Sequence, residues 1–242
     1  MKKTIITFIL FAVCISVNAQ NWWNSKTIKG NGNVITKTRT IDEFDSVALV
    51  GSFDLNLVDG DEGKITINAE ENLIPYIITE VEGGELKVKF KKNINVRTYK
   101  KIVITIPFEE IDGVVLSGSG DIVSEKTIEA NTFEVSLSGS GDITLDVEAN
   151  NIETNISGSG DVKLSGKTKN FDCAISGSGD IHGYELEVTN LKAAIAGSGN
   201  IKATVLNKIE AGIAGSGDIY YKGKPKYIDV GSVGSGDAID KN

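Results

Sequence analysis

The stretch that decides the fold is LSGSGDI, residues 116–122, which returns six times toward the C-terminus. The copies that begin at residues 137, 156, 175, 195 and 213 keep the pattern closely, and the copy that begins at residue 232 reads SVGSGDA. Consecutive copies lie 18 to 21 residues apart. So regular a period over seven copies is typical of a repeat architecture, in which each unit is one small piece of supersecondary structure.

Between the motifs, apolar residues alternate with polar ones, which is the period of a half-buried strand. One unit has such a run at residues 133, 135 and 137 before its motif and another at 143, 145 and 147 after it. A single unit cannot bury its apolar face, so we expect the units to stack, with parallel strands about 4.8 Å apart. The prediction is an all-β protein, a parallel β-solenoid with coils of about 19 residues, right-handed by the rule for parallel crossovers. Whether its cross-section has two or three faces stays open.

The glycines of the motif have a conformational explanation. A chain that reverses direction within three or four residues needs positive φ angles, which glycine adopts without a steric penalty. The neighbouring Asp can accept hydrogen bonds from backbone amides that the turn leaves free. We therefore expect the whole motif to be a corner of the solenoid, with both glycines in the turn conformation.

The N-terminal half contains a degenerate copy of the corner, LVGSFDL at residues 49–55. After it we expect a strand at 64–68, a short helix around 70–76, a hairpin of 78–82 and 85–91 that turns at Gly83-Gly84, and a strand at 102–107. We interpret residues 41–112 as larger, decorated coils and 113–238 as regular repeats of one solenoid domain, 41–242. Residues 20–40 are interpreted as an N-terminal segment or cap.

Residues 1–19 have a basic start, an apolar stretch and a small residue before the expected cleavage site, as in a secretory signal peptide. The chain is therefore expected to be exported, to the periplasm, the outer membrane or the exterior. Loss of Lys2 and Lys3 takes the formal charge from −8 to −10, which disfavours nucleic acid as a partner. Elsewhere the sequence lacks the roughly 18 consecutive apolar residues of a transmembrane anchor.

Two further stretches carry a family resemblance. The run from TRTIDEFDSVALVGSFDLNL through EGGELKVKF, residues 38–90, and the run KIVITIPFEEIDGVVLSGSGDI, residues 101–122, resemble the bacterial family called putative auto-transporter adhesin, head GIN domain. The resemblance covers roughly residues 37–230. It implies a secreted or envelope-associated β-helical protein with an uncharacterised biochemical role, and it carries no catalytic or ligand residues onto this chain.

One acidic position recurs in almost every coil and forms a column if the corners stack in register. Carboxylates about 5 Å apart could form a calcium ladder, but Asn200 occupies the same position in one coil, and an amide keeps a turn hydrogen bond while giving up the charge. We prefer a structural capping role, with calcium as the alternative. The carboxylates of this column are those of Asp121, Asp142, Asp161, Asp180, Asp218 and Asp237.

A second column consists of small residues on the outer surface of the strand that precedes the corner. Small side chains in register would form a flat strip that another surface can approach closely, so we interpret it as a docking face for a partner, a second copy or a glycan. The alternative is that the chain's own N-terminal segment covers it. The strip consists of Ser136, Asn155, Ala174, Ala194, Gly212 and Gly231.

No motif for catalysis or for a cofactor stands out. The sequence contains no phosphate loop, zinc-ligand spacing or nucleophile elbow, and its single histidine, His182, is expected on the surface. We expect a non-enzymatic, adhesin-like interaction protein that presents a rigid, repetitive acidic surface to an unidentified protein or glycan. A carbohydrate-binding module or carbohydrate-active enzyme, and a purely structural envelope spacer, are the alternatives, and the oligomeric state stays open.

Overall fold

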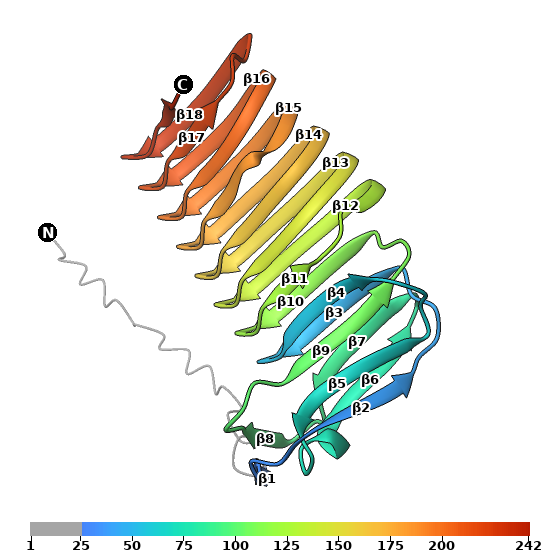
Figure 1. Ribbon diagram of the computed structural model, residues 1–242. Coiled ribbons are helices and arrows are strands. Elements are labelled where there is room, and N and C mark those ends of the chain that lie inside the picture. The colour runs from blue at the N-terminus through green and yellow to red at the C-terminus, as the bar shows by residue number, and fades with distance from the viewer. Residues whose placement is uncertain (1–25) are drawn as a thin grey trace, which may run out of the picture.

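The computed structural model describes residues 26–242, which form a rod of stacked strands (Figure 1). Besides one short 3-10 helix, η2 (Ile74–Tyr76), all regular elements are strands. The strands are β1 (Lys26–Lys29), β2 (Val34–Thr40), β3 (Ser46–Gly51), β4 (Asp54–Asp59), β5 (Lys64–Glu70), β6 (Ile77–Glu82), β7 (Glu85–Phe90), β8 (Ile94–Arg97), β9 (Val103–Phe108), β10 (Gly113–Gly118), β11 (Ile122–Ser124), β12 (Ile128–Gly139), β13 (Ile143–Gly158), β14 (Val162–Gly177), β15 (Ile181–Gly197), β16 (Ile201–Gly215), β17 (Ile219–Lys222), β18 (Tyr227–Gly234) and β19 (Ala238–Asp240).

The parallel β-solenoid is confirmed, with coils of about 19 residues. From β10 to β19 each strand segment pairs in parallel with its copy in the next coil, and equivalent glycines of successive corners lie opposite one another. Each coil has two strand runs, one before the corner and one after it. At the opposite edge a bend joins them, within continuous strands such as β13, where Asn150 falls outside the pairing register. The sequence left open how many faces the cross-section of the solenoid has. Each coil contributes two strand runs.

Both glycines of each corner stack closely on the preceding corner, and the first has a second, conformational reason to be glycine. The first has positive φ, such as 135° at Gly139 and 132° at Gly158, as expected for the turn. The second, such as Gly160, does not have positive φ. A Cβ atom on Gly160 would instead collide with the carbonyl oxygen of Gly141 in the preceding coil. The prediction that both glycines serve the turn conformation is therefore wrong for the second one, which is required by the close stacking of corners.

The N-terminal end does not follow chain order. The degenerate corner is a true coil, because β3 and β4 pair in parallel with β10 and β11, and Gly51 lies opposite Gly118. On their other side β3 and β4 pair with β7 and β9. The chain therefore leaves the stack after β4, builds the end of the rod, and returns on the opposite side of its first coil (Figure 1).

The decorations of this end match the expectations in part. The hairpin is confirmed, since β6 and β7 pair antiparallel across Gly83 and Gly84. The helix expected at 70–76 is wrong in length, because only Ile74–Tyr76 forms one 3-10 turn, with Pro75 near its start. Antiparallel pairs of β5 with β2 and β9 add a feature that the repeat pattern did not predict.

The core is a continuous column of inward side chains along the rod. The alternation expected from the sequence is confirmed, since Phe133, Val135 and Leu137 are all buried, as are their equivalents in the next three coils. Cys173 belongs to this column, and burial raises the pKa of its thiol well above the ordinary range. Thiolate is the reactive form, so Cys173 is a core residue rather than a reactive thiol.

Candidate functional site: an apolar groove along the rod

The strip of small residues forms one wall of a groove on the outer face of the strands that precede the corners. Successive members of the strip are register partners across β12 to β16 and β18, so that Ser136 lies opposite Asn155 and Ala194 opposite Gly212. The groove has a volume of about 960 Å³. All six residues proposed from the sequence line it: Ser136, Asn155, Ala174, Ala194, Gly212 and Gly231.

A second outward column, two residues nearer the corner, completes the groove. Sequence reasoning missed this column because its small residues look like part of the corner motif itself. The signal was present, since the position changes from Ser to Ala and Val along the chain while the corner glycines stay constant. The column consists of Ser138, Ser157, Ser176, Ala196, Ala214 and Val233.

The groove is apolar and changes along its length. None of the residues that line it is charged. Its β12 and β13 end carries the hydroxyl and amide groups of Ser136, Ser138 and Asn155. Its β15 to β18 end is lined by Ala, Gly, Ile and Val together with Ser232, whose hydroxyl donates to the carbonyl oxygen of Gly236. Because strands are about 4.8 Å apart, the five steps from Ser136 to Gly231 span about 24 Å. The result is a long, narrow surface with one polar end.

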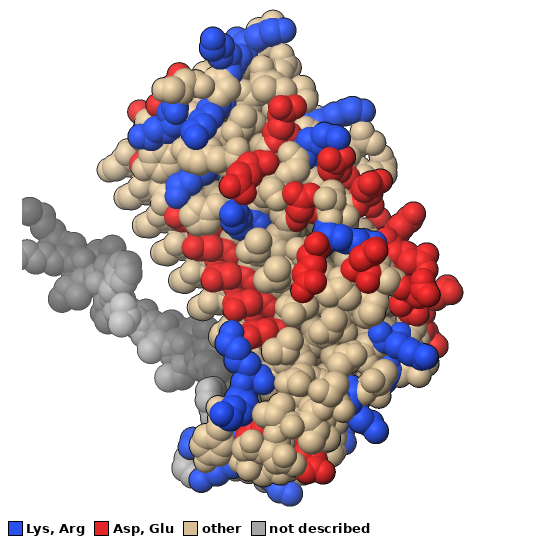
Figure 2. Space-filling model, viewed as in Figure 1, with Lys and Arg blue, Asp and Glu red and all other residues tan. Residues whose placement is uncertain are grey.

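An acidic ridge borders the groove on the side away from the corners. Its side chains are exposed, and the one cation in it, Lys192, lies 3.0 Å from the carboxylate of Asp172. Acidic side chains also gather over the middle coils on the face of the rod that Figure 2 shows. The ridge consists of Glu134, Glu153, Asp172, Lys192, Glu210 and Asp229.

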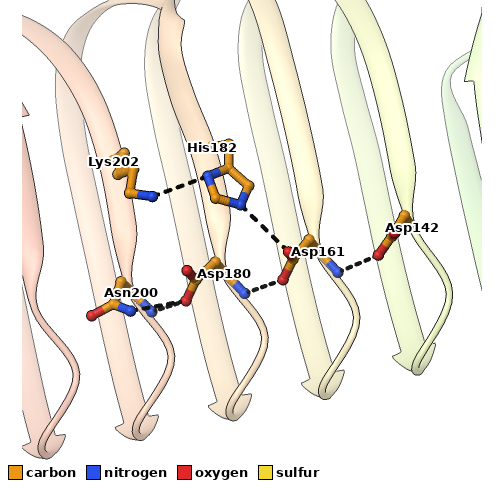
Figure 3. A network of polar contacts seen from close by, with 6 residues as sticks. All are labelled: Asp142, Asp161, Asp180, His182, Asn200 and Lys202. Atoms are coloured by element: carbon orange, nitrogen blue, oxygen red, sulfur yellow. Dashed lines mark hydrogen bonds and ion pairs between the residues drawn. The ribbon is translucent and has the colours of Figure 1, made fainter.

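The aspartate column is a structural ladder between coils. The backbone N–H of Asp161 donates to Oδ1 of Asp142 at 3.0 Å, and that of Asp180 donates to Oδ1 of Asp161 at 2.9 Å (Figure 3). Asn200 both donates to Asp180 and accepts from the N–H of Asp218. The capping expected within one turn thus connects neighbouring turns, and the amide of Asn200 fits because the bond needs an oxygen acceptor and no charge.

The calcium alternative gains no support from this arrangement. Asp121 and Asp218 continue the ladder by accepting from the N–H groups of Asp142 and Asp237. Within residues 26–242 no group of three or more His, Cys, Asp or Glu side chains has a geometry that could hold a metal ion.

His182 lies beside this ladder on the outer face of the strand that follows the corner. It is half-buried, with Nε2 3.4 Å from Oδ2 of Asp161 and Nδ1 3.3 Å from Nζ of Lys202 (Figure 3). A lysine ammonium can only donate, so Nδ1 accepts from Lys202 while Nε2–H donates to Asp161. His182 was expected on the surface. It lies on the outer face of the strand, half-buried within a chain of polar contacts along the rod.

A second hollow, of about 560 Å³, lies at the bend edge of the coils and is charged rather than apolar. Glu110, Glu129, Glu148 and Glu187 line it, together with Lys167, whose Nζ lies 2.6 Å from the carboxylate of Glu148. These carboxylates are partly neutralised by lysine and open to water, which leaves the apolar groove as the more distinctive surface of the molecule.

Fold and surface together define a class of protein, a parallel β-solenoid with an apolar groove along one face. The model of the family described as "Putative auto-transporter adhesin, head GIN domain" matches residues 43–225. The chain belongs to this family, and the resemblance noted in its sequence is confirmed. The comparison with curated proteins gives no match.

Solved structures share the fold over most of the chain. A putative adhesin from Bacteroides fragilis NCTC 9343 is 23% identical with a TM-score of 0.84, and a putative adhesin from Parabacteroides merdae ATCC 43184 is 23% identical with a TM-score of 0.68. A putative lipid binding protein from Parabacteroides distasonis ATCC 8503 is 27% identical with a TM-score of 0.73. The alignments cover 88%, 90% and 88% of this chain, respectively, and all of each neighbour.

The expected relation to a membrane is addressed in part by the structure. Among residues 26–242, no helix combines the length and apolarity that crossing a bilayer requires. The signal peptide expected at residues 1–19 lies outside the described residues.

Proposed function

We propose that this protein is an exported, non-enzymatic interaction protein of the cell envelope that holds an acyl chain of a lipid in its apolar groove. The observation that carries the proposal is the uncharged lining of the groove over six successive coils. Contiguous apolar surface that a soluble domain leaves exposed marks a site of interaction. The adhesin description of the family is consistent with a binding role, with a partner that is not identified.

The chemistry of the groove favours an acyl chain over a glycan. A glycan needs convergent hydrogen-bond donors and acceptors, and the β15 to β18 end offers Ala194, Ala196, Gly212 and Val233 instead. Each methylene that leaves water contributes up to about 0.8 kcal/mol. A narrow surface of about 24 Å suits a single extended chain, and the lipid-binding description of the 27% identical neighbour supports the same ligand class.

The polarity of the groove gives the ligand an orientation. The headgroup would lie at the β12 and β13 end, where Ser136 and Asn155 can form hydrogen bonds, and the methyl end would lie near Gly212 and Gly231. The acidic ridge beside the groove would repel an anionic headgroup or an anionic bilayer surface. We therefore expect a neutral or zwitterionic lipid, bound as a single molecule, rather than attachment to a charged membrane.

Binding of a fluorescent acyl probe tests the proposal. A monoacyl lipid with a zwitterionic headgroup and an environment-sensitive dye on its chain is titrated with the mature protein, residues 20–242, below the concentration at which the probe forms micelles. The double variant Ala194→Lys/Gly212→Lys places two ammonium groups in the groove and is expected to weaken binding by at least roughly ten-fold, because each blocks burial of several methylenes. Both positions are exposed, and a Cβ on Gly212 meets no atom within 4 Å.

A matched control separates the groove from general charge effects. Thr144→Lys adds one positive charge, as Gly212→Lys alone does, at an exposed position on the other strand face, in register between Val123 and Lys163. This control should bind the probe like the wild type, whereas Gly212→Lys alone should already weaken binding. Equal binding by the groove variant and the control would contradict the proposal. So would a glycan array in which the wild-type protein binds sugars while the acyl probe gives no signal.

A further inference from the structure

The two ends of the rod differ in how they close the core. At the β18 end, Ile228 is 48% exposed, although it occupies the position that is buried in each of the strands β12 to β16. Within residues 26–242, β18 pairs with β16 alone, so its other edge is unpaired. The buried equivalents of Ile228, each at most 2% exposed, are Phe133, Ile152, Phe171, Leu191 and Ile209.

The opposite end is covered by the chain itself. β2 crosses this end antiparallel to β5, and the Arg39 guanidinium donates to the carbonyl oxygens of Ile74 and Ile77 at 2.8 and 2.7 Å. Among the described residues, the outermost strand of the sheet that contains β18 is β6, which pairs with β7 and carries Glu80 and Glu82, while β2 is outermost in the other sheet. Charged residues protect a strand edge from pairing. Head-to-tail stacking of rods would bring β18 against this protected end, which makes it unfavourable.

The β18 edge lacks such protection and is apolar on both sides. Its outward residues Tyr227 and Val233 are 65% and 80% exposed, and Asp229 is its single charged residue. An unprotected edge strand of this kind is a template for pairing with another strand. Because the two ends of one rod do not match, the complementary surface available in a second copy is the same end.

We propose that two copies of this chain pair through β18, antiparallel about a two-fold axis at Val230. In this register Tyr227 lies opposite Val233 of the second copy, and Asp229 lies opposite Gly231. Ile228 and Ser232 face each other on the core side. A register centred one residue earlier, at Asp229, would place the two Asp229 carboxylates directly opposite each other. Like charges at directly opposite positions of paired strands are destabilising.

The proposed dimer has a consequence for the surface of the rod. A two-fold axis that makes β18 antiparallel to its copy runs perpendicular to the sheet, so both apolar grooves lie on the same face of a rod of double length. Two grooves on one rigid body could bind two ligands of the same surface, and linked sites gain affinity through a high effective concentration. The contact is confined to the end of a narrow rod, so we expect weak, concentration-dependent association.

Sedimentation velocity of residues 20–242 over a series of concentrations tests association, and a charge exchange tests the register. Tyr227→Lys or Val233→Glu alone should weaken the dimer by roughly ten-fold, since each disrupts two symmetric cross-strand pairs worth up to about 1 kcal/mol each. The double variant Tyr227→Lys/Val233→Glu should restore association, because each lysine then faces a glutamate of the second copy. Val123→Lys changes a partly exposed valine of β11, away from the β18 edge; it is the control and should leave association unchanged.

Three results would overturn the proposal. The wild-type protein could stay a monomer at every soluble concentration, the dimer could persist in both single variants, or the double variant could stay as weak as the singles. Species larger than a dimer that grow with concentration would instead indicate head-to-tail stacking.

Discussion

Two corners of the same solenoid show what a coil needs from its neighbour. In the regular corners the last residue of the Gly-Ser-Gly sequence is glycine, and at Gly160 a side chain would collide with the backbone of the preceding corner. In the corner of the first coil the same position is Phe53, which is fully buried and whose ring centroid lies 4.4 Å from that of Phe90. The two corners share a backbone register, since Gly51 lies opposite Gly118.

The difference follows from the layer of the stack that lies under each corner, on the side toward the covered N-terminal end of the rod. Beneath Gly160 is another corner, whose carbonyl oxygen points at the place a Cβ would take. Beneath Phe53 the stacked strands are β7 and β9, which no corner joins, because the chain between them forms β8. The space is filled by aromatic rings. Glycine at this position is therefore a requirement of stacking, and it disappears where the stack begins.

The largest effect is expected for Phe53→Gly, which writes the consensus corner into the first coil. Glycine is the residue that the regular corners have at this position, so the repeat pattern alone would predict no loss of stability. Loss of a buried aromatic ring instead predicts that the free energy of unfolding falls by about 3–5 kcal/mol. Chemical denaturation of the variant and the wild type measures the difference. Tyr99→Ala, which removes an aromatic side chain exposed at the same end, is the control and should cost little. A Phe53→Gly variant as stable as the wild type would contradict the stacking explanation.

The next effect concerns a regular corner. Gly160→Ala forces a Cβ against the Gly141 carbonyl, and we expect a loss of about 3 kcal/mol, at the upper end for overpacking because a backbone cannot yield as a side chain does. The matched control is Gly212→Ala, where no atom lies within 4 Å of the new Cβ and φ is not positive. That variant should be neutral or slightly more stable. Thermal unfolding that ranks the two variants in the reverse order would be incompatible with this interpretation.

The smallest effect belongs to the covered end of the rod. Glu70 is fully buried and accepts hydrogen bonds from the Thr98 hydroxyl at 2.7 Å and the backbone N–H groups of Gly32 and Tyr99 at 2.6 and 3.0 Å. The Thr98 bond lowers the pKa of Glu70, against the opposing effect of burial. We expect Glu70→Gln to lose about 1–2 kcal/mol at pH 7.

The lowered pKa fixes the direction of the pH dependence. A carboxyl whose pKa is lower in the folded state stabilises the protein above its unfolded pKa, near 4.5, and this stabilisation is lost as the pH falls through the folded pKa. The stability difference between Glu70→Gln and the wild type should therefore shrink below about pH 4.5. Unfolding curves from pH 7 to pH 3 measure it, with the exposed Glu125→Gln as the control. A difference that stays constant over this range would contradict the role of the ionised carboxylate.

Most of the rod could be predicted from local pattern. The alternation around residues 133–147 predicted inward and outward faces, and the spacing of the corners predicted stacking in register; both are confirmed. The strip from Ser136 to Gly231 was recognised as a column, and it lines the groove. Its second wall, which includes Ala196 and Val233, was missed. Alternation shows which residues point outward, but it does not show which neighbouring columns together form a groove.

The covered end escaped prediction because its strands are not repeats. No periodicity relates β5 or β6 to the coil of β3 and β4, and their antiparallel pairing depends on the route of the chain in space. The short helix was overestimated for a related reason, since Glu70 is held in β5 by its hydrogen bonds to the segment after β8.

The sequence by itself determined that this chain is a stacked solenoid, because a repeated unit with one apolar face can bury that face only against its own copies. It also determined the outward columns, since side chains alternate along a strand whatever lies nearby. Only the tertiary structure decided that the first coil sits inside the stack, why the second glycine must be glycine, and that two columns of small residues form one groove. These properties depend on distances between segments that are far apart in the chain, and no local pattern encodes such distances.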